Sequence, residues 1–299
     1  MNGLFANTII QVIFAGLTIG AVYSLVAVGF SIVYMGTRAI NFMQGEYVMI
    51  GGVVAGSAYE VWNLPVPACL ALAAGAGVLA GVISEAITVR WMRRPSPSGI
   101  TVATVGLAVV LKAIVMIATD RKTFAFPPFT GDTPIKIGGA ALLPQTLWNL
   151  GIVVAAAVLL TLFFRYTRAG VTIRASADDA ETAKAMGVSL ITTVRQSFIL
   201  AAVLGTIAGA SLTPITLISF NSGTLLGLKG FSAAVLGGLG NMYGALASGL
   251  IIGLVESIGA GFISSLYSNV IAFAVLLFVL FVKPAGILAK QQGWDHEKK

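Results

Sequence analysis

An apolar run without a single charged residue extends over residues 8–35. A membrane-spanning helix needs roughly 20 consecutive apolar residues, whereas the apolar core of a secretory signal peptide is only about 7–15 residues long. No Lys or Arg precedes the run, so it also lacks the positively charged leading segment of a signal peptide. We therefore expect a retained membrane-spanning helix here.

Apolar runs of similar length recur along the chain, separated by short polar gaps. The later runs cover residues 41–59, 65–89, 99–119, 148–164, 196–228, 230–255 and 257–282. Only 10% of the residues are charged, against about 25% in soluble domains, so a water-facing surface cannot be built from this chain. The sequence predicts an all-α, polytopic transmembrane helix bundle of about eight spans, forming one transmembrane domain over residues 1–299.

One further element is predicted in the glycine-rich segment 227–240, which Gly237 and Gly238 interrupt. If the polar stretch 165–195 is cytoplasmic, the basic residues of the tail, 283–299, also fall inside only when this segment crosses the membrane once more. A helix of about 12 residues rises about 18 Å, less than the roughly 30 Å apolar core of a bilayer. We expect a short broken pass or a re-entrant helix.

Several chemical functions are excluded by residue type. The chain has one cysteine, Cys69, and one histidine, His296, which excludes an internal disulfide, most zinc sites and most nucleophile–histidine pairs. The nearest approach to a phosphate-binding loop starts at Gly223, but Lys229 there is followed by glycine and not by Ser or Thr. We expect no catalytic residue, no metal site and no cofactor on this chain, and no nucleic-acid partner.

Two kinds of feature in the apolar segments are candidates for function: paired glycines and charged residues. Paired glycines four residues apart predict close helix packing, or alternatively helix sliding, at Gly16/Gly20, Gly52/Gly56, Gly77/Gly81, Gly205/Gly209 and Gly249/Gly253. Charges in apolar segments are expensive and are candidates for function. Glu46 is expected near the cytoplasmic end of its span, Glu85 is expected to pair with Arg90, Lys112 to snorkel or pair, and Glu256 to lie between two spans.

The polar stretch 165–195 is longer than a simple connection and contains the sequence DDAETAK. Ser176 can cap a helix whose first turn holds Asp178 and Asp179, and Gly187 can end it. Ala183, Ala185 and Met186 would give this helix a small apolar face. Such a face on an exposed helix either binds a partner or belongs to a chance helix in a solvated loop.

The chain resembles the LivH-type permease subunits of ATP-binding-cassette (ABC) importers for branched-chain amino acids. The resemblance covers nearly the whole chain, in four motifs in the family's order: AINFMQGEYVMIG (39–51), RASADDAETAKAMGV (174–188), the glycine-rich segment 231–257, and KPAGILA (283–289). The last motif ends in Ala289 where the family has glycine.

The resemblance implies that the 165–195 loop docks on an ATPase subunit. Glu181, Ala183 and Gly187 match the E-x-A-x-x-x-G core of the family's loop, while Thr182 replaces an alanine and no Leu-Pro follows Gly187. The residues expected to form this surface are Asp178, Asp179, Glu181, Ala183, Lys184, Met186 and Gly187.

The resemblance also implies partners and a location: a second, related permease chain, two ATPase subunits that carry the ATP and magnesium, a periplasmic binding protein, and the lipid of a bacterial inner membrane. Polar or broken positions are the candidates for the transport pathway: Asn41, Gln44, Glu46, Gly237 and Gly238. Two alternatives remain open, namely an importer of urea or another small amide or amino acid, and an autonomous secondary carrier or channel.

Overall fold

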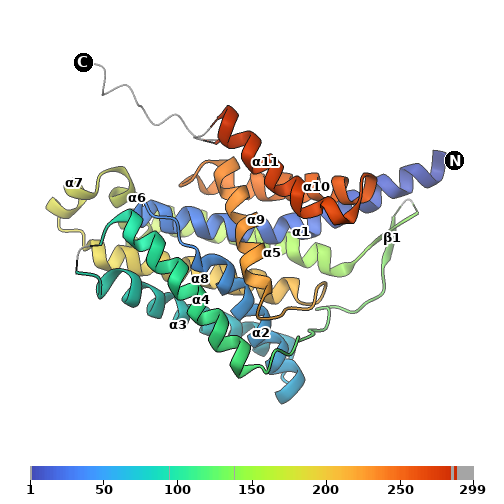
Figure 1. The fold of residues 1–299 in the computed structure, drawn as a ribbon, viewed down its shortest axis with the longest axis horizontal. Helices are drawn as coiled ribbons and strands as arrows, with labels where there is room; N and C mark the ends of the chain where they lie inside the picture. Colours follow the sequence, from blue (N-terminus) through green and yellow to red (C-terminus); the bar gives the residue numbers. More distant parts are fainter. Residues whose placement is uncertain (1, 94, 138, 284–285, 288–299) are drawn as a thin grey trace.

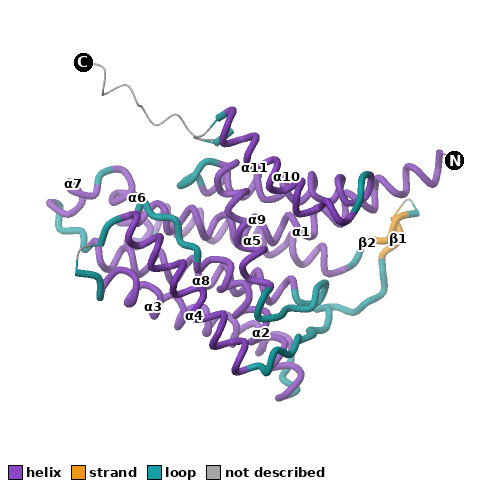
Figure 2. The backbone as a smooth tube through the Cα atoms, in the orientation of Figure 1, coloured by secondary structure: helices purple, strands orange, loops and turns teal. Residues whose placement is uncertain are grey.

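The computed structural model describes residues 2–93, 95–137, 139–283 and 286–287, and it is a bundle of helices (Figures 1 and 2). Its α-helices are α1 (Asn2–Thr37), α2 (Met43–Trp62), α3 (Val66–Glu85), α4 (Pro97–Ala118), α5 (Pro144–Tyr166), α6 (Arg168–Asp178), α7 (Ala180–Ala185), α8 (Leu190–Leu212), α9 (Ser222–Gly237), α10 (Met242–Phe262) and α11 (Ser268–Val282). A π-helical turn, Ala86–Arg90, extends α3, and a 3₁₀ turn, Ser265–Tyr267, precedes α11. Strands β1 (Ile135–Ile137) and β2 (Ala140–Leu142) form an antiparallel hairpin between α4 and α5, with Ile135 opposite Leu142.

Seven helices of the described part are long and apolar enough to cross a membrane: α1, α3 with its π-turn, α4, α5, α8, α10, and α11 with its 3₁₀ turn. Helix α2 has 20 residues but carries Glu46 and Glu60, and α9 has only 16 residues. The predicted all-α, multi-pass membrane architecture is confirmed.

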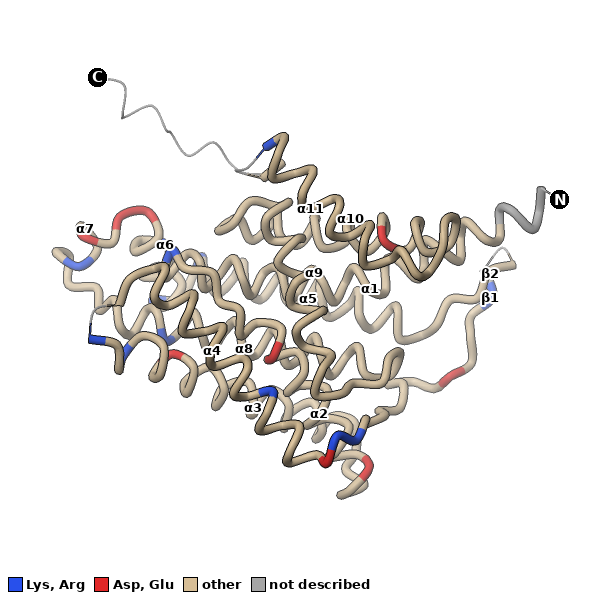
Figure 3. The backbone as a smooth tube through the Cα atoms, in the orientation of Figure 1, with Lys and Arg blue, Asp and Glu red and all other residues tan. Residues whose placement is uncertain are grey.

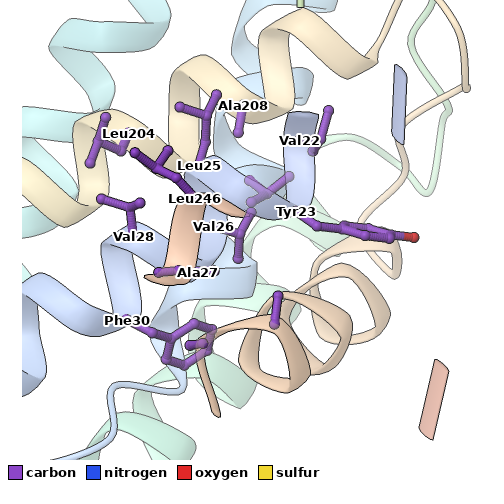
Figure 4. Close-up of a cluster of buried hydrophobic side chains, with 14 of the residues drawn as sticks. Val22, Tyr23, Leu25, Val26, Ala27, Val28, Phe30, Leu204, Ala208 and Leu246 are labelled. Atoms are coloured by element: carbon purple, nitrogen blue, oxygen red, sulfur yellow. The ribbon is translucent and has the colours of Figure 1, made fainter. Parts of the chain in front are cut away.

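The centre of the bundle is α1, whose residues between Ala21 and Val33 are all buried. Its side chains interlock with Leu204 and Ala208 of α8 and with Leu246 of α10 (Figure 4). Lipid tails are as apolar as leucine, so dense packing, more than exclusion of water, holds helices together at this depth. Helix α1 is thus the element against which the others are arranged.

Pairs of glycines allow close contacts between neighbouring helices. Gly16 and Gly20 of α1 face Gly249 and Gly253 of α10, and a Cβ added at Gly16 would lie 2.8 Å from the Cα of Leu254. Gly77 and Gly81 of α3 approach the backbone of α8 in the same way. The prediction that glycine pairs bring helices together is confirmed for these pairs and for Gly205/Gly209, which face α2. It is wrong for Gly52/Gly56, which face Ile218 and Phe124 of the connections.

The predicted boundaries in the second half of the chain are wrong. The span predicted over 196–228 ends at Leu212, shortly before Pro214, and the chain then turns back to start α9 at Ser222. Gly238 and Gly240 adopt positive φ angles of 84° and 87°, which only glycine takes readily, so the span predicted over 230–255 is broken. The span predicted over 257–282 is also divided, because α10 continues to Phe262 before α11 begins.

Helix α9 covers residues 222–237 and overlaps the element predicted over 227–240; its length of about 24 Å is less than the apolar core of a bilayer, as expected of a short broken pass or a re-entrant helix. The first residue after α9, Gly238, lies in contact with Gly286, and Ile287 donates its N–H to the carbonyl of Leu236 at 2.9 Å. The tail therefore starts at the same end of the bundle as Arg38, α6 and α7, which we call the α7 end. The remaining tail residues, 288–299, lie outside the described residues.

Charged residues gather at the two ends of the bundle (Figure 3). The α7 end holds α6, α7 and the connection from α3 to α4 with Arg90 and Arg93, while Arg121, Lys122 and Lys136 lie in the α4–α5 connection at the opposite end. An excess of basic residues marks the cytoplasmic side of a membrane protein. The α7 end also holds Arg38, Arg165, Arg168, Arg174, Lys184 and Arg195, so this rule predicts that the α7 end is cytoplasmic.

Candidate functional site

Helix α6 continues the chain from α5 and is fixed to the end of the bundle. The hydroxyl of Thr167 accepts a hydrogen bond from Gly170 N at 3.0 Å and caps the helix. Gly170 approaches the backbone of Phe163 and Phe164 too closely to accommodate a side chain, and Ile173 is fully buried in the main core. These contacts make α6 a fixed arm.

Helix α7 follows after one residue, Asp179, which is its N-cap. Asp179 Oδ1 accepts hydrogen bonds from Glu181 N at 3.0 Å and from Thr182 N at 3.1 Å. The prediction that Ser176 caps the helix and that Asp178 lies in its first turn is wrong, because both belong to α6, where Ala175 O accepts from Asp179 N. The extended backbone of Asp179 separates the two helices.

Gly187 ends the region as expected, with φ at 87°. Gly187 N donates to Lys184 O and Val188 N donates to Ala183 O, a glycine-dependent pattern that satisfies the last carbonyls of a helix. Ala183 is buried, whereas Glu181 and Lys184 are exposed and Met186 is 82% exposed. The predicted apolar face is therefore divided: Ala183 holds α7 in place and Met186 projects from the protein.

The pKa of Asp179 is below its ordinary value. The hydroxyl of Thr182 and the backbone N–H groups of Thr182 and Glu181 all donate to the carboxylate and stabilise its charged form. The cap is thus fully charged at neutral pH.

A cavity of about 820 Å³ lies at the α7 end between α1, α5, α6 and the turn from α9 to α10. Arg38, Arg165 and Arg174 line it together with Gly238, one of the residues predicted for the pathway. Arg38 Nη2 donates to the carbonyl of Ala177, which ties the end of α1 to the end of α6. Gly237 packs against the backbone of Gly244 and does not line the cavity, so only one of the two predicted glycines belongs to it.

Asn41 and Gln44, also predicted for the pathway, are completely buried. Asn41 Oδ1 accepts from Met43 N at 3.1 Å at the start of α2, and Gln44 Nε2 donates to Ala201 O of α8 at 3.0 Å. In this structure Asn41 bonds within the start of α2, and Gln44 joins α2 to α8.

Glu46 lies deeper than the sequence suggests. Phe42, immediately before α2, donates its N–H to Thr104 Oγ1, and Thr104 is about 10 Å along α4 from Pro97. Helix α2 therefore starts inside the bundle. Glu46 lies in its first turn, at the expected end of the span, but with 3% exposure it does not face the membrane surface. Its Oε1 accepts from Thr224 Oγ1 of α9 at 3.1 Å.

Glu256 was expected between two spans but lies within α10 and is buried. Lys229 Nζ of α9 is 2.6 Å from Glu256 Oε1, Ser268 Oγ of α11 donates to the same oxygen at 2.6 Å, and Tyr23 OH of α1 donates to Oε2 at 3.0 Å. Lys229 was not predicted as the partner of Glu256, because it lies between the predicted runs 196–228 and 230–255. The sequence did contain a signal, since a Lys and a Glu among apolar segments each need a partner of opposite charge.

The predicted pairing of Glu85 with Arg90 is confirmed at 2.9 Å, and Arg195 of α8 approaches the same carboxylate at 3.3 Å. Lys112 was expected to snorkel or pair, and its Nζ donates to Asn221 Oδ1 just before α9. Within the described residues, no group of three His, Cys, Asp or Glu side chains could hold a metal ion.

Comparison with known proteins relates this architecture to transport. A family described as the permease component of branched-chain amino acid transport systems matches residues 12–280. The high-affinity branched-chain amino acid transport system permease protein LivH of Escherichia coli is 30% identical over 298 residues, covering 95% of this chain and 96% of that protein. Its counterpart BraD of Pseudomonas aeruginosa is 29% identical over 296 residues, with the same coverage. A probable LivH of Methanocaldococcus jannaschii is 28% identical over 280 residues, covering 88% of this chain and 87% of that protein.

Proposed function

Because the chain belongs to the family of permease components of branched-chain amino acid transport systems, we propose that it forms half of the membrane pathway of an ABC importer for a branched-chain or closely related amino acid. The chain is a multi-pass membrane protein and a transport subunit, not an enzyme. Its proposed location is the bacterial inner membrane, with the α7 end in the cytoplasm.

The observation that carries the proposal is the α6–α7 arm. Helix α6 is fixed to the bundle through buried Ile173, while α7 presents the exposed side chains of Glu181, Lys184 and Met186. An exposed methionine flanked by charges suits a protein partner, because methionine adapts its shape and is enriched at interfaces. We assign this surface to docking of an ATPase subunit.

The arm is also placed to transmit movement. Arg38 is the first residue after α1, and its bond to the carbonyl of Ala177 joins that helix to the last turn of α6. A displacement of α7 by a partner would therefore reach α1, which packs along α8 and α10. Bound partners thus bias the bundle between two arrangements, provided that they bind one arrangement more tightly.

The proposed complex contains this chain, a second related permease chain, two ATPase subunits that bind ATP with magnesium, and a periplasmic binding protein that delivers the amino acid. ATP hydrolysis then takes place on the ATPase subunits. This chain contributes the docking arm and one wall of the pathway.

A co-purification experiment tests the proposal. The chain is tagged, solubilised in mild detergent, and compared with the double variant Lys184→Glu, Met186→Asp. Both side chains are exposed, so the variant leaves the buried Ala183 and the fold of α7 intact. The matched control is Lys122→Glu, Leu266→Asp at the opposite end, where Leu266 is 86% exposed.

We expect the wild type and the control to bring down an ATP-hydrolysing subunit, and the α7 variant to lose at least about 90% of it, since a charge reversed at the centre of an interface costs several kcal/mol. Equal recovery with the α7 variant would refute the docking assignment. If the wild type recovers no ATPase while other membrane complexes stay intact, the autonomous carrier becomes the better hypothesis.

A further inference from the structure

A second, smaller cavity lies within the membrane part of the bundle. Its volume is about 250 Å³, below the range of about 300–1,000 Å³ that is usual for drug-sized ligands, so it suits a small molecule. Residues of α1, α2, α4 and α9 line it. Lys112 fixes its depth: this residue is about 22 Å along α4 from Pro97 and about 9 Å from Ala118. The cavity therefore lies along the span of α4, away from both of its ends, and it is open on the side of the exposed residues Val105, Val109 and Leu228.

The wall from α2 carries an incompletely satisfied carboxylate. Glu46 is only 3% exposed, and its Oε1 accepts from Thr224. Its Oε2 is buried and accepts no hydrogen bond from any described residue. A buried carboxylate oxygen without a donor costs at least about 1–3 kcal/mol, a cost that a ligand with a positively charged donor would remove. Glu46 lines the cavity, but Oε2 itself is buried against Gly223, so the carboxylate must turn toward the cavity for this oxygen to contact a ligand.

The facing wall, from α4, carries a positive charge. Lys112 lines the same cavity and its Nζ donates to Asn221 Oδ1, next to the start of α9. An ammonium has three donors, so this bond leaves capacity for a ligand carboxylate. Thr224 in the first turn of α9 adds a hydroxyl and the positive end of a helix dipole on that side.

The remaining wall is apolar. It consists of Phe30, Phe42, Val105, Ala108, Val109 and Leu228, with the two glycines Gly45 and Gly227. A carboxylate, an ammonium and an apolar wall in one small cavity are complementary to a molecule that carries an ammonium, a carboxylate and a hydrocarbon side chain on one carbon.

We propose that this cavity binds the zwitterionic head of an aliphatic α-amino acid, with Glu46 Oε2 accepting from the ammonium and Lys112 Nζ donating to the carboxylate. The inference rests on the proposed function and adds to it a binding site in the membrane with a role for each residue. Thr224 positions Glu46, and the apolar wall receives the hydrocarbon side chain.

The test measures equilibrium binding to the complete complex in lipid nanodiscs, without the binding protein. The probes are L-leucine, leucinamide, which lacks the carboxylate, and isocaproate, which lacks the ammonium. The variants are Glu46→Gln and Lys112→Met. The matched control is Glu60→Gln, because Glu60 lies on the same helix but is exposed and accepts from Ala125 N at the opposite end.

We expect Glu46→Gln to weaken leucine and leucinamide binding by at least about tenfold and to leave isocaproate binding unchanged, since a hydrogen bond between charged groups is lost for ammonium-bearing probes only. Lys112→Met should weaken leucine and isocaproate by a similar factor and leave leucinamide unchanged. A purely structural role would weaken all three probes together. Lys112→Met alone decides the question if Glu46→Gln does not assemble with the ATPase subunit.

Uptake by the wild-type complex with its binding protein separates this inference from the proposed function. If the wild type takes up leucine but both variants bind all three probes like Glu60→Gln, the cavity is not the site and the proposed function stands. If the wild type takes up no amino acid although an ATPase co-purifies, both proposals are overturned.

Discussion

Lys229 Nζ lies 2.6 Å from Glu256 Oε1 inside the bundle, and the two side chains are only 6% and 7% exposed. Tyr23 and Ser268 complete the shell around the carboxylate, so one Glu joins α1, α9, α10 and α11. Each charge compensates the other at a depth where water cannot, and α9 is short enough to need such support.

Removing one member of this pair should be costlier than removing both. Glu256→Gln leaves the ammonium of Lys229 buried without its counter-charge, and breaking a buried pair in this way costs about 3–5 kcal/mol. The double variant Lys229→Met, Glu256→Gln removes both charges and should recover most of that loss. Thermal unfolding of the purified protein in detergent measures the difference, and a double variant as unstable as Glu256→Gln would contradict the pairing.

The ion pairs of Glu85 provide a contrast. Arg90 and Arg195 have side chains that are 40% and 39% exposed, so both can turn to solvent when the carboxylate is lost. We expect Glu85→Gln to lower the unfolding temperature clearly less than Glu256→Gln, because partly exposed pairs contribute about 1 kcal/mol or less. Equal losses in the two variants would show that exposure of the partner does not decide the cost.

The all-α, multi-pass architecture could be predicted from the sequence, because long apolar runs indicate the segments that lie in the membrane. Charge asymmetry then predicted the orientation and one more short element, and α9 lies where that element was expected. What failed were the junctions: hydropathy does not distinguish a helix from a turn when both are buried. Lys229 and Glu256 interrupt the apolar sequence and therefore mark the predicted ends of spans, although both lie within helices. The chain turns instead at Gly238 and Gly240, inside an uninterrupted apolar run.

The candidate site was predicted less completely for a related reason. The short helix of the docking arm was predicted from local signals, acidic residues near its start and a terminal glycine, which depend on neighbours in the chain, although its cap is Asp179 and not the predicted Ser176. The cavity at Glu46 depends on Lys112 and Thr224, which are distant in sequence and meet only because α2 starts inside the bundle. A single sequence contains no signal for that contact.

The glycines between α1 and α10 should tolerate no side chain. A Cβ at Gly253 would collide with the Cα of Gly20, and backbone on both sides cannot move aside. We expect Gly253→Ala to destabilise the protein by about 1–3 kcal/mol. Gly75→Ala is the matched control, because nothing lies within 4 Å of a Cβ there, and it should be neutral or stabilising by up to about 1 kcal/mol. Thermal unfolding of both variants in detergent decides between this view and one in which the helices can separate.

The cap of α7 should depend on pH in a predictable direction. The pKa of Asp179 in the folded protein lies below its ordinary value of 3.8, so its contribution to stability is fully present above pH 3.8 and is lost as the pH falls through the lowered value. Hydrogen exchange at Glu181 and Thr182, corrected for the intrinsic effect of pH, should therefore lose protection only in acid. Asp179→Ala should remove this protection at every pH, whereas Asp179→Asn should retain much of it, because an amide oxygen can cap but does not titrate in this range. An acid-induced loss of the same size in Asp179→Asn would assign the titration to another group, and full protection in Asp179→Ala would show that the cap has no role in holding the arm.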